Sequence, residues 1–279
     1  MPQTHRHEPD ARDPSQPAAA LLLGCRMWTP EILALIAVTF IVAGFVKGTI
    51  GLGLPTVTLA VLTLPLGLKT SLAVVVIPLV ATNLWQALAG PHLKTILVRF
   101  WPFLLTAMVS VWIGIQVLAT ARTDYLVALL GLILIVNSLI SFTRYRISAP
   151  ARNRETAWSV ACSAAGGVMF GMTGNFIVPG ILFLQSLGMH RDMLVQALGV
   201  TFVTISTTLA LSLGSRSLMT GDLTAISTIS VIPAFLGVWL GRQYRSSISE
   251  TQFARLFHIG LLVIGCYLLL GAVRNLLSN

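Results

Sequence analysis

The feature that most constrains this chain is a succession of long apolar runs that contain no charged residue. These runs cover residues 32–46, 48–68, 70–93, 100–121, 125–143, 156–190, 193–215, 223–241 and 256–273. A helix needs about 20 residues to cross the ~30 Å hydrocarbon layer of a bilayer, and most of the runs approach or exceed that length. The runs show no alternation of polar and apolar residues, so helices are favoured over a barrel. The sequence therefore predicts an all-α polytopic membrane protein with about eight transmembrane helices.

The composition argues against the soluble alternatives. Hydrophobic residues make up 55% of the chain and charged residues only 10%, whereas a soluble domain carries about 25% charged residues. The net charge of +9 is spread singly or in small groups between the apolar runs, as in the loops of membrane proteins. We therefore expect a lipid bilayer around the chain and no nucleic-acid partner.

Two apolar segments are too long for one simple crossing. Residues 32–68 contain a single charge and residues 156–190 contain none, and a straight helix of either length would run roughly 50–55 Å. Glycine and proline interrupt both near the middle, over Gly48–Pro55 and Gly171–Pro179. We expect a broken or re-entrant helix at each place.

The two breaks belong to a longer internal similarity that keeps its order along both halves. The matching segments are Gly44-xxx-Gly48-xx-Gly51 with Gly167-xxx-Gly171-xx-Gly174, Leu66-Gly67-Leu68 with Leu187-Gly188-Met189, Trp112-Ile-Gly114 with Trp239-Leu-Gly241, and Gly131-Leu-Ile-Leu-Ile with Gly260-Leu-Leu-Val-Ile. This pattern indicates a duplication, with each repeat opening on a glycine-rich break. The Gly-xxx-Gly spacing before each break also fits close helix packing.

The predicted organisation has four parts. Residues 1–30 form a disordered tail, 31–142 the first membrane repeat, 143–156 a basic cytoplasmic linker, and 157–279 the second membrane repeat. Eight crossings would place both ends of the chain inside. Ten crossings, with each break as a hairpin, would place both ends outside and make the repeats inverted, as in many transporters. The distribution of basic residues favours the first arrangement only weakly.

Acidic side chains are missing from the middle of the apolar runs. All nine acids lie in the tail or at boundaries: Glu8, Asp10, Asp13, Glu31, Asp124, Glu155, Asp192, Asp222 and Glu250. No HExxH, GxSxG or phosphate-binding loop is present. We expect no enzyme activity, no metal and no cofactor.

Lys47 is the charged residue inside a long apolar unit, one position before Gly48. Inserting an ammonium into the membrane costs about 2.5–3.5 kcal/mol, so such a residue indicates a functional site. A broken helix can offer backbone N–H groups to an anion, and the lysine would add a charge. The alternative is that its side chain extends to the membrane interface.

The other polar residues in the apolar runs can be interpreted as functional or as structural. Asn175, at the second break, is either an uncharged donor to substrate or a helix cap. Thr49 and Thr173 are expected to bond back to their own helices. Asn83, Gln86 and Gln196 either line a cavity or join helices. For His258, packing as a neutral side chain is favoured over proton relay.

The segment Gly44-Phe-Val-Lys47-Gly48-Thr-Ile-Gly51-Leu-Gly53 resembles the glycine-rich signature of the TauE/SafE family of membrane permeases. The second break departs from that signature, with Phe170 in place of its basic residue. The resemblance covers roughly 30–275 and implies transport of sulfite, organosulfonates or related small anions across the bacterial inner membrane. It implies that Lys47, Gly48, Gly51 and Gly53 form one half of the site and Gly171, Gly174 and Asn175 the other.

The sequence thus predicts a secondary transporter for small anions, with a non-transporting accessory membrane subunit as the alternative and a homodimer left open. The predicted substrate-binding residues are Lys47, Gly48, Thr49, Gly51, Gly53, Asn83, Gly171, Thr173, Gly174 and Asn175.

Overall fold

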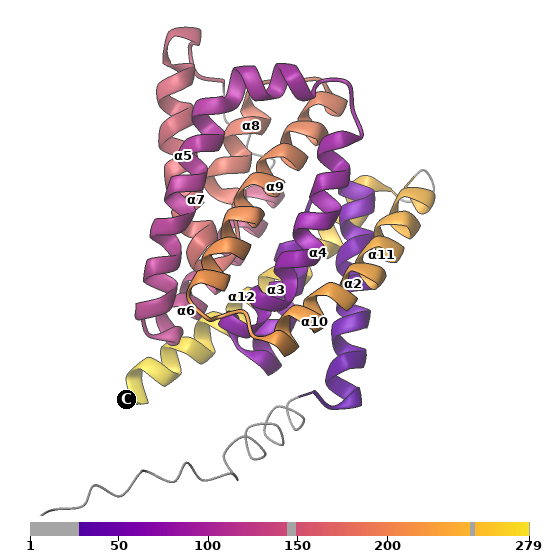
Figure 1. Cartoon of the computed structure of the whole chain (residues 1–279), viewed down its shortest axis with the longest axis vertical. Coiled ribbons are helices and arrows are strands. Elements are labelled where there is room, and N and C mark those ends of the chain that lie inside the picture. Colours follow the sequence, from indigo (N-terminus) through magenta and orange to yellow (C-terminus); the bar gives the residue numbers. More distant parts are fainter. Residues whose placement is uncertain (1–27, 144–148, 246–248, 279) are drawn as a thin grey trace, which may run out of the picture. The chain divides into compact units, whose positions relative to one another are not determined.

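A computed structural model describes residues 28–143, 149–245 and 249–278, and the regular elements of these ranges are all helices (Figure 1). The chain falls into two compact units, Met1–Leu35 and Ile36–Asn279. Most of the predicted tail, and Arg144 and Arg146 of the predicted linker, lie outside the described residues. The first unit contributes the opening turns of α2 (Pro30–Ile50), and the second holds the rest of α2 and all later helices.

The later elements follow in chain order. They are α3 (Leu54–Leu66), α4 (Leu68–Leu88), α5 (Leu93–Thr120), α6 (Thr123–Thr143), the short 3₁₀ turn η1 (Arg152–Arg154), α7 (Glu155–Thr173), the π-helical turn η2 (Ile177–Ile181), α8 (Leu182–Ser186), α9 (Arg191–Ser215), α10 (Gly221–Ile229), α11 (Val231–Tyr244) and α12 (Glu250–Ser278).

Seven helical segments of the described chain are long and apolar enough to cross a membrane, one fewer than predicted. They are α2, α4, α5, α6, α9, the pair α10–α11 and most of α12. The run over 156–190 was expected to supply a crossing. Its helix α7 has 19 residues, but Ala, Gly and Ser are abundant in it and lower its mean hydropathy.

The predicted helix interruptions are confirmed. α2 ends at Ile50 and α3 begins at Leu54, and between them Gly51 and Gly53 have φ values of +92° and +111°. In the second half, α7 ends before Gly174, whose φ is +71°. These left-handed conformations cost little only for glycine, which explains why glycines mark both breaks.

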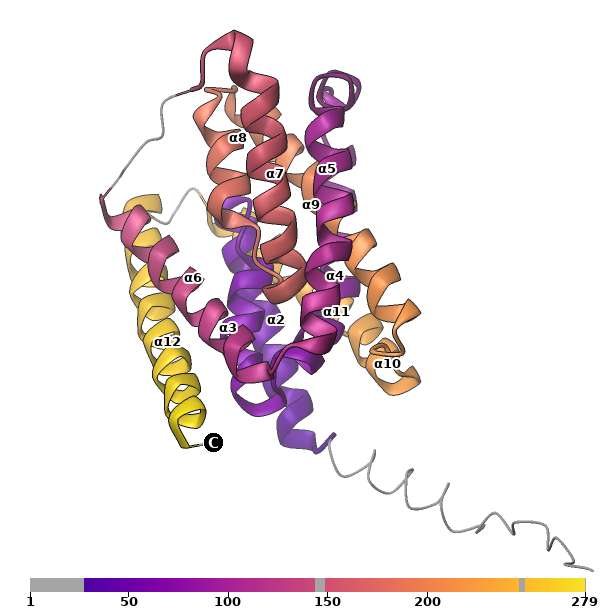
Figure 2. The ribbon, with the colours of Figure 1, turned by 90° about the vertical axis from the view of Figure 1, so that its left-hand side faces the viewer.

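Within the second unit, α4 and α9 pack side by side and are the most buried of the candidate spans. Figure 2 shows α5 beside α7 and α6 beside α12. The outer helix α12 is the least buried of the candidate spans and keeps many apolar side chains exposed, as with Leu256 at 69%. A bilayer rather than water suits such a surface.

Glycines let two pairs of helices approach until their backbones touch. A Cβ atom added at any of them would meet a main-chain oxygen of the partner helix. Between α2 and α11, the contacts pair Gly44 with Ala234 and Gly48 with Val238. Between α7 and α5, they pair Gly167 with Ala107 and Gly171 with Val111. The predicted packing role of both Gly-xxx-Gly pairs is therefore confirmed.

The helix ends of the second unit gather at two opposite ends, visible in Figures 1 and 2. The linker end carries the α4–α5 and α8–α9 connections, the start of α7 and the end of α11. Its described basic residues are Lys94, Arg99, Arg152, Arg154, Arg191, Arg242, Arg245 and Arg255, against Lys69, Arg122, Arg216 and Arg274 at the opposite end. Basic residues are therefore concentrated at the linker end.

Candidate functional site

Lys47 lies in the last turn of α2 with only 5% of its surface exposed. Its Nζ donates to Asn83 Oδ1 at 2.5 Å and to Thr82 Oγ1 at 3.1 Å, both on α4. Asn83 is held in turn because its Nδ2 donates to the Leu79 carbonyl at 2.7 Å. The ammonium is therefore fixed against α4 by neutral oxygens and does not extend to an exposed position.

Among the described residues, Lys47 has no acidic partner. The ion pairs of the described residues lie elsewhere, at Arg99–Glu155, Arg122–Asp124 and His190–Asp192. An ammonium has three N–H donors, and the bonds to α4 use two of them. A buried cation with only neutral partners is costly, so an anion placed beside it would be stabilised.

A small cavity of about 50 Å³ adjoins the ammonium, and we call it the Lys47 pocket. Its walls come from α2, α4, α9 and α11, and it is lined by Lys47, Gly48, Gly51, Thr82, Trp85, Gln86, Val195, Val238, Arg242 and Arg245. This space is large enough for a few water molecules or a small oxyanion. None of the described residues that line it carries a carboxylate.

Arg242 brings a second cation to the Lys47 pocket. It follows Gly241, whose close contact with α2 at Gly48 holds the two helices together. Its guanidinium lies 4.5 Å from the centre of the Trp85 ring, a cation–π contact that orients it. Lys47 and Arg242 therefore present two positive charges to one cavity.

A wider cavity of about 450 Å³, the basic vestibule, shares four lining residues with the Lys47 pocket: Gln86, Val195, Arg242 and Arg245. Arg191 adds a further cation, and Asp192 is the acid of the lining. The carboxyl side chain of Asp192 is 79% exposed. The vestibule lies at the linker end and adjoins the Lys47 pocket at these shared residues.

Two glutamines hold the walls of these spaces together. The Gln86 side chain donates to the Val195 carbonyl at 2.8 Å and to the Gly51 carbonyl at 3.2 Å. The Gln196 side chain donates to the carbonyls of Ala87 and Gly90 at 2.8 and 2.7 Å. Both glutamines therefore join helices, one of the two roles considered for them, and both also line a cavity: Gln86 lines both spaces and Gln196 lines the vestibule.

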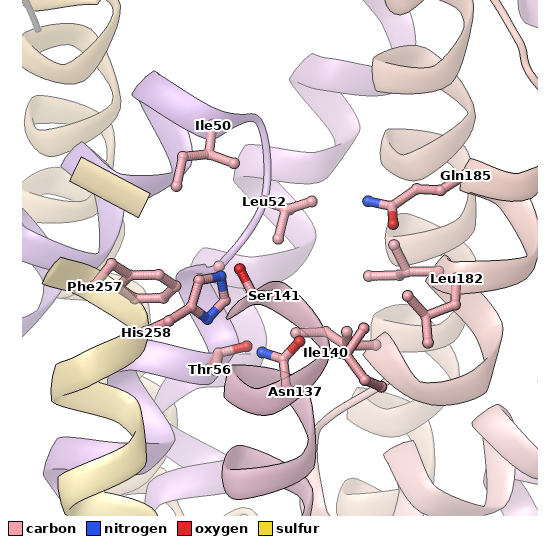
Figure 3. Close-up of a pocket in the computed structure, with 13 residues that line it drawn as sticks. Ile50, Leu52, Thr56, Asn137, Ile140, Ser141, Leu182, Gln185, Phe257 and His258 are labelled. Atoms are coloured by element: carbon pink, nitrogen blue, oxygen red, sulfur yellow. The ribbon is translucent and has the colours of Figure 1, made fainter. Parts of the chain in front are cut away.

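A third and larger space, the central cavity, has a volume of about 540 Å³ and lies between the two breaks. It is lined by Ile50, Leu52, Gly53, Thr56, Asn137, Ile140, Ser141, Ile177, Ile181, Leu182, Gln185, Phe257 and His258. Figure 3 shows the His258 ring, Ser141 and Asn137 on one side of it, with Gln185 and Leu182 reaching in from the other. Its lining is apolar with a few neutral polar groups, and His258 is its titratable member.

The second break is packed among apolar side chains. A Cβ atom added to Gly174 would lie nearest to the side chains of Leu59 and Leu72. Asn175 is 1% exposed; its Oδ1 accepts from the Ile177 amide at 3.0 Å, while its Nδ2 has no partner among the described residues. The amide side chain therefore caps the break, one of its two predicted roles.

The predicted site residues are thus only partly brought together. Gly48 and Gly51 line the Lys47 pocket, Asn83 bonds to Lys47, and Gly53 lines the central cavity. Thr49 and Thr173 donate back to carbonyls of their own helices, as predicted. The predicted residues that line none of the three cavities are Thr49, Asn83, Gly171, Thr173, Gly174 and Asn175.

Sequence reasoning missed Arg242 and Trp85 as members of the site. Arg242 ends an apolar run, where a basic residue ordinarily anchors a helix at the membrane interface. The sequence feature that could have indicated Arg242 is its position directly after Gly241, which belongs to the Trp-x-Gly segment that matches between the two halves. Among the described residues no cluster of His, Cys, Asp or Glu could hold a metal ion.

Comparison with known proteins gives one finding. A family model described as sulfite exporter TauE/SafE matches residues 35–268, which is most of the chain. The predicted resemblance is therefore confirmed. No curated protein and no solved structure matches.

Proposed function

This chain belongs to the TauE/SafE sulfite exporter family of membrane transporters, and from that premise we propose that it is a secondary transporter of small oxyanions. Sulfite, organosulfonates and related sulfur-containing or organic anions are the substrate class that fits. The sequence has no phosphate-binding loop, so an ion gradient would drive transport. The membrane proposed is the bacterial inner membrane.

The observation that carries the proposal is the buried ammonium of Lys47, bonded to neutral oxygens and facing a cavity without a carboxylate. In a membrane protein a charge of this kind is retained where a ligand compensates it. We assign the oxyanion to the Lys47 pocket. Lys47 and Arg242 supply charge, and Thr82 and Gln86 supply neutral hydrogen-bonding groups.

The basic vestibule supports the same assignment. Arg191, Arg242 and Arg245 line one concave space, where cations concentrate anions and raise their rate of arrival. The vestibule would deliver an anion from the linker end to the Lys47 pocket. Basic residues concentrate on the cytoplasmic side of membrane proteins, so we place the linker end in the cytoplasm.

We further propose that the two halves are inverted repeats that move against each other. The support is reciprocal packing: α2 of the first half contacts α11 of the second, and α7 of the second contacts α5 of the first. Both contacts use the glycines that match in sequence. Alternating access by rocking one half against the other is common in such folds. The packed second break then has a structural role, and the Lys47 pocket is the anion site.

Flux measurements with the purified full-length chain in proteoliposomes test the transporter function. Sulfite, thiosulfate, sulfoacetate, taurine and a plain carboxylate would be offered one at a time. We expect carrier-mediated exchange of at least one sulfur oxyanion, inhibited by excess unlabelled anion. No exchange of any of them, together with copurification of another membrane protein, would favour the accessory subunit.

A further inference from the structure

The central cavity bears on a question that the Lys47 pocket does not answer, namely which ion gradient would drive the proposed transport. Residues of both breaks line this cavity, from Ile50–Gly53 in the first to Ile177–Ile181 in the second. Movement of one half against the other would change its shape. A group in this cavity is therefore placed to sense which state the transporter occupies.

His258 is the cavity residue that can change its charge. Its Nδ1 atom is buried and has no hydrogen-bond partner among the described residues. Its ring contacts the rings of Phe142 and Phe257, with centroids 6.3 and 5.1 Å away. A buried ring nitrogen without a partner can accept a proton or donate to a ligand oxygen, and imidazole is the side chain whose charge ordinarily changes between pH 5 and 8.

The elements packed around His258 leave it without an acidic partner in the cavity. α12 contacts α6 and α3, and Phe253 of α12 contacts Phe45 of α2. The titratable side chains described on these elements beyond residue 35 are Lys47 on α2, Asp124 and Tyr125 at the start of α6, and Arg255, Cys266, Tyr267 and Arg274 on α12. None of these lines the cavity, and α3, η2 and α8 carry none.

One stretch of backbone, residues 50–52, contributes to the walls of both this cavity and the proposed anion site. Gly51 lines the Lys47 pocket, while its neighbours Ile50 and Leu52 line the central cavity. Gln86 donates to the Gly51 carbonyl, so one wall of the anion site and one wall of the His258 cavity move together. Occupation of either cavity would therefore be felt in the other.

We propose that His258 is the proton-binding residue of the transport cycle and that the central cavity is the proton site. The proposal rests on the transporter function argued above. A proton passes from water on the more acidic side to the unpartnered ring nitrogen when the anion loads, and from the ring to water on the other side when the anion leaves. One anion then crosses with one proton.

The test compares gradient-driven accumulation with exchange, using the anion that the wild-type chain exchanges fastest. In wild-type proteoliposomes a pH gradient, acidic outside, should drive accumulation of about tenfold per pH unit for one proton and one anion in electroneutral symport. His258→Gln should abolish accumulation and flatten the pH profile of any exchange that remains. His190→Gln, an exposed histidine in the α8–α9 connection, should behave as wild type.

A second measurement needs no variant. Anion binding to the wild-type chain, followed calorimetrically in buffers of different ionisation enthalpy, should take up a fraction of a proton between pH 5.5 and 8. His258→Gln should remove that uptake. No proton uptake by the wild type, accumulation driven by a sodium gradient alone, or full pH-driven accumulation by His258→Gln would overturn the proposal. Exchange by the wild type in any of these cases would leave the transporter function standing.

Discussion

At the scale of single residues, the chain places two cations beside one small cavity, and no carboxylate is among the described residues that line it. Lys47 is buried and fixed by Thr82 and Asn83, whereas Arg242 is exposed and stacked on Trp85. The two cations therefore have different tasks. In the proposed anion site, Lys47 would hold the bound anion and Arg242 would capture it at the mouth of the pocket.

Replacing Arg242 should weaken anion capture more than it slows turnover. A hydrogen bond to a charged group contributes about 1.5–3 kcal/mol, so Arg242→Gln should raise the KM for transport about tenfold or more with a smaller effect on kcat. Initial-rate flux measurements over a range of anion concentrations provide both constants. Arg255→Gln, an exposed cation on α12, is the control. Equal KM values for the two variants would remove Arg242 from the site.

Asn83→Asp should weaken anion binding without unfolding the chain. The substitution keeps the shape of the side chain and puts a carboxylate where Oδ1 now lies 2.5 Å from Lys47 Nζ. An internal ion pair would then compete with the external anion. We expect binding to weaken about tenfold or more, by the same charged hydrogen-bond energy, while the melting temperature is retained. Asn153→Asp, exposed in η1, is the control; undiminished binding by Asn83→Asp would contradict the assignment.

Sequence reasoning reached Lys47 and Asn83 because polar atoms inside apolar runs are expensive and therefore informative. It also predicted the back-bonding of Thr49 and Thr173, which depends only on the local helix. Arg242 was missed because its role depends on α11 lying against α2. Such a contact is set by packing between distant segments, which one sequence does not reveal.

At the scale of elements, backbone contact through glycine holds each broken helix to a helix of the other half. Overpacking such a contact typically costs 1–3 kcal/mol. Gly44→Ala should therefore lower the melting temperature in detergent by several degrees, because its Cβ would collide with the Ala234 carbonyl. Gly260→Ala has open space around the new methyl group and should match or exceed the wild type. Equal melting temperatures for Gly44→Ala and the wild type would mean that α2 and α11 do not pack as described.

The breaks were predictable because glycine and proline act locally on helix geometry. The number of membrane-spanning helices was not predictable in the same way, since α7 combines many small residues with tight packing against α5. Small residues lower hydropathy and at the same time permit close approach. A helix of this kind can lie inside a membrane protein without looking like a typical crossing.

At the scale of the whole molecule, the grouping of basic residues supports the proposed orientation, with the linker end in the cytoplasm. Sequence counts of basic residues left two arrangements open, because the count depends on how many times the breaks cross. In the second unit, the basic residues of α5, α9 and α11 lie together at the linker end. This grouping favours the inverted arrangement. Three-dimensional grouping was the missing information.

Single-cysteine labelling should show the linker end on the cytoplasmic side. In a background without Cys25, Cys162 and Cys266, Ala149→Cys before α7 should be protected from an impermeant maleimide in intact spheroplasts and become labelled on lysis. Thr120→Cys, at the opposite end of α5, should be labelled before lysis. The reverse pattern would place the vestibule outside, and labelling of both positions from one side would contradict the arrangement of helices.

The most direct measurement of the central claim is equilibrium binding of sulfite to the purified full-length chain, compared between wild type and Lys47→Gln. Glutamine can still bond to Thr82 and Asn83 but carries no charge, so the fold should persist while sulfite binding weakens at least about tenfold. Lys69→Gln, at the start of α4 and outside the described cavities, should bind as the wild type does. Saturable sulfite binding of equal affinity in wild type and Lys47→Gln would contradict an anion site built on the Lys47 ammonium.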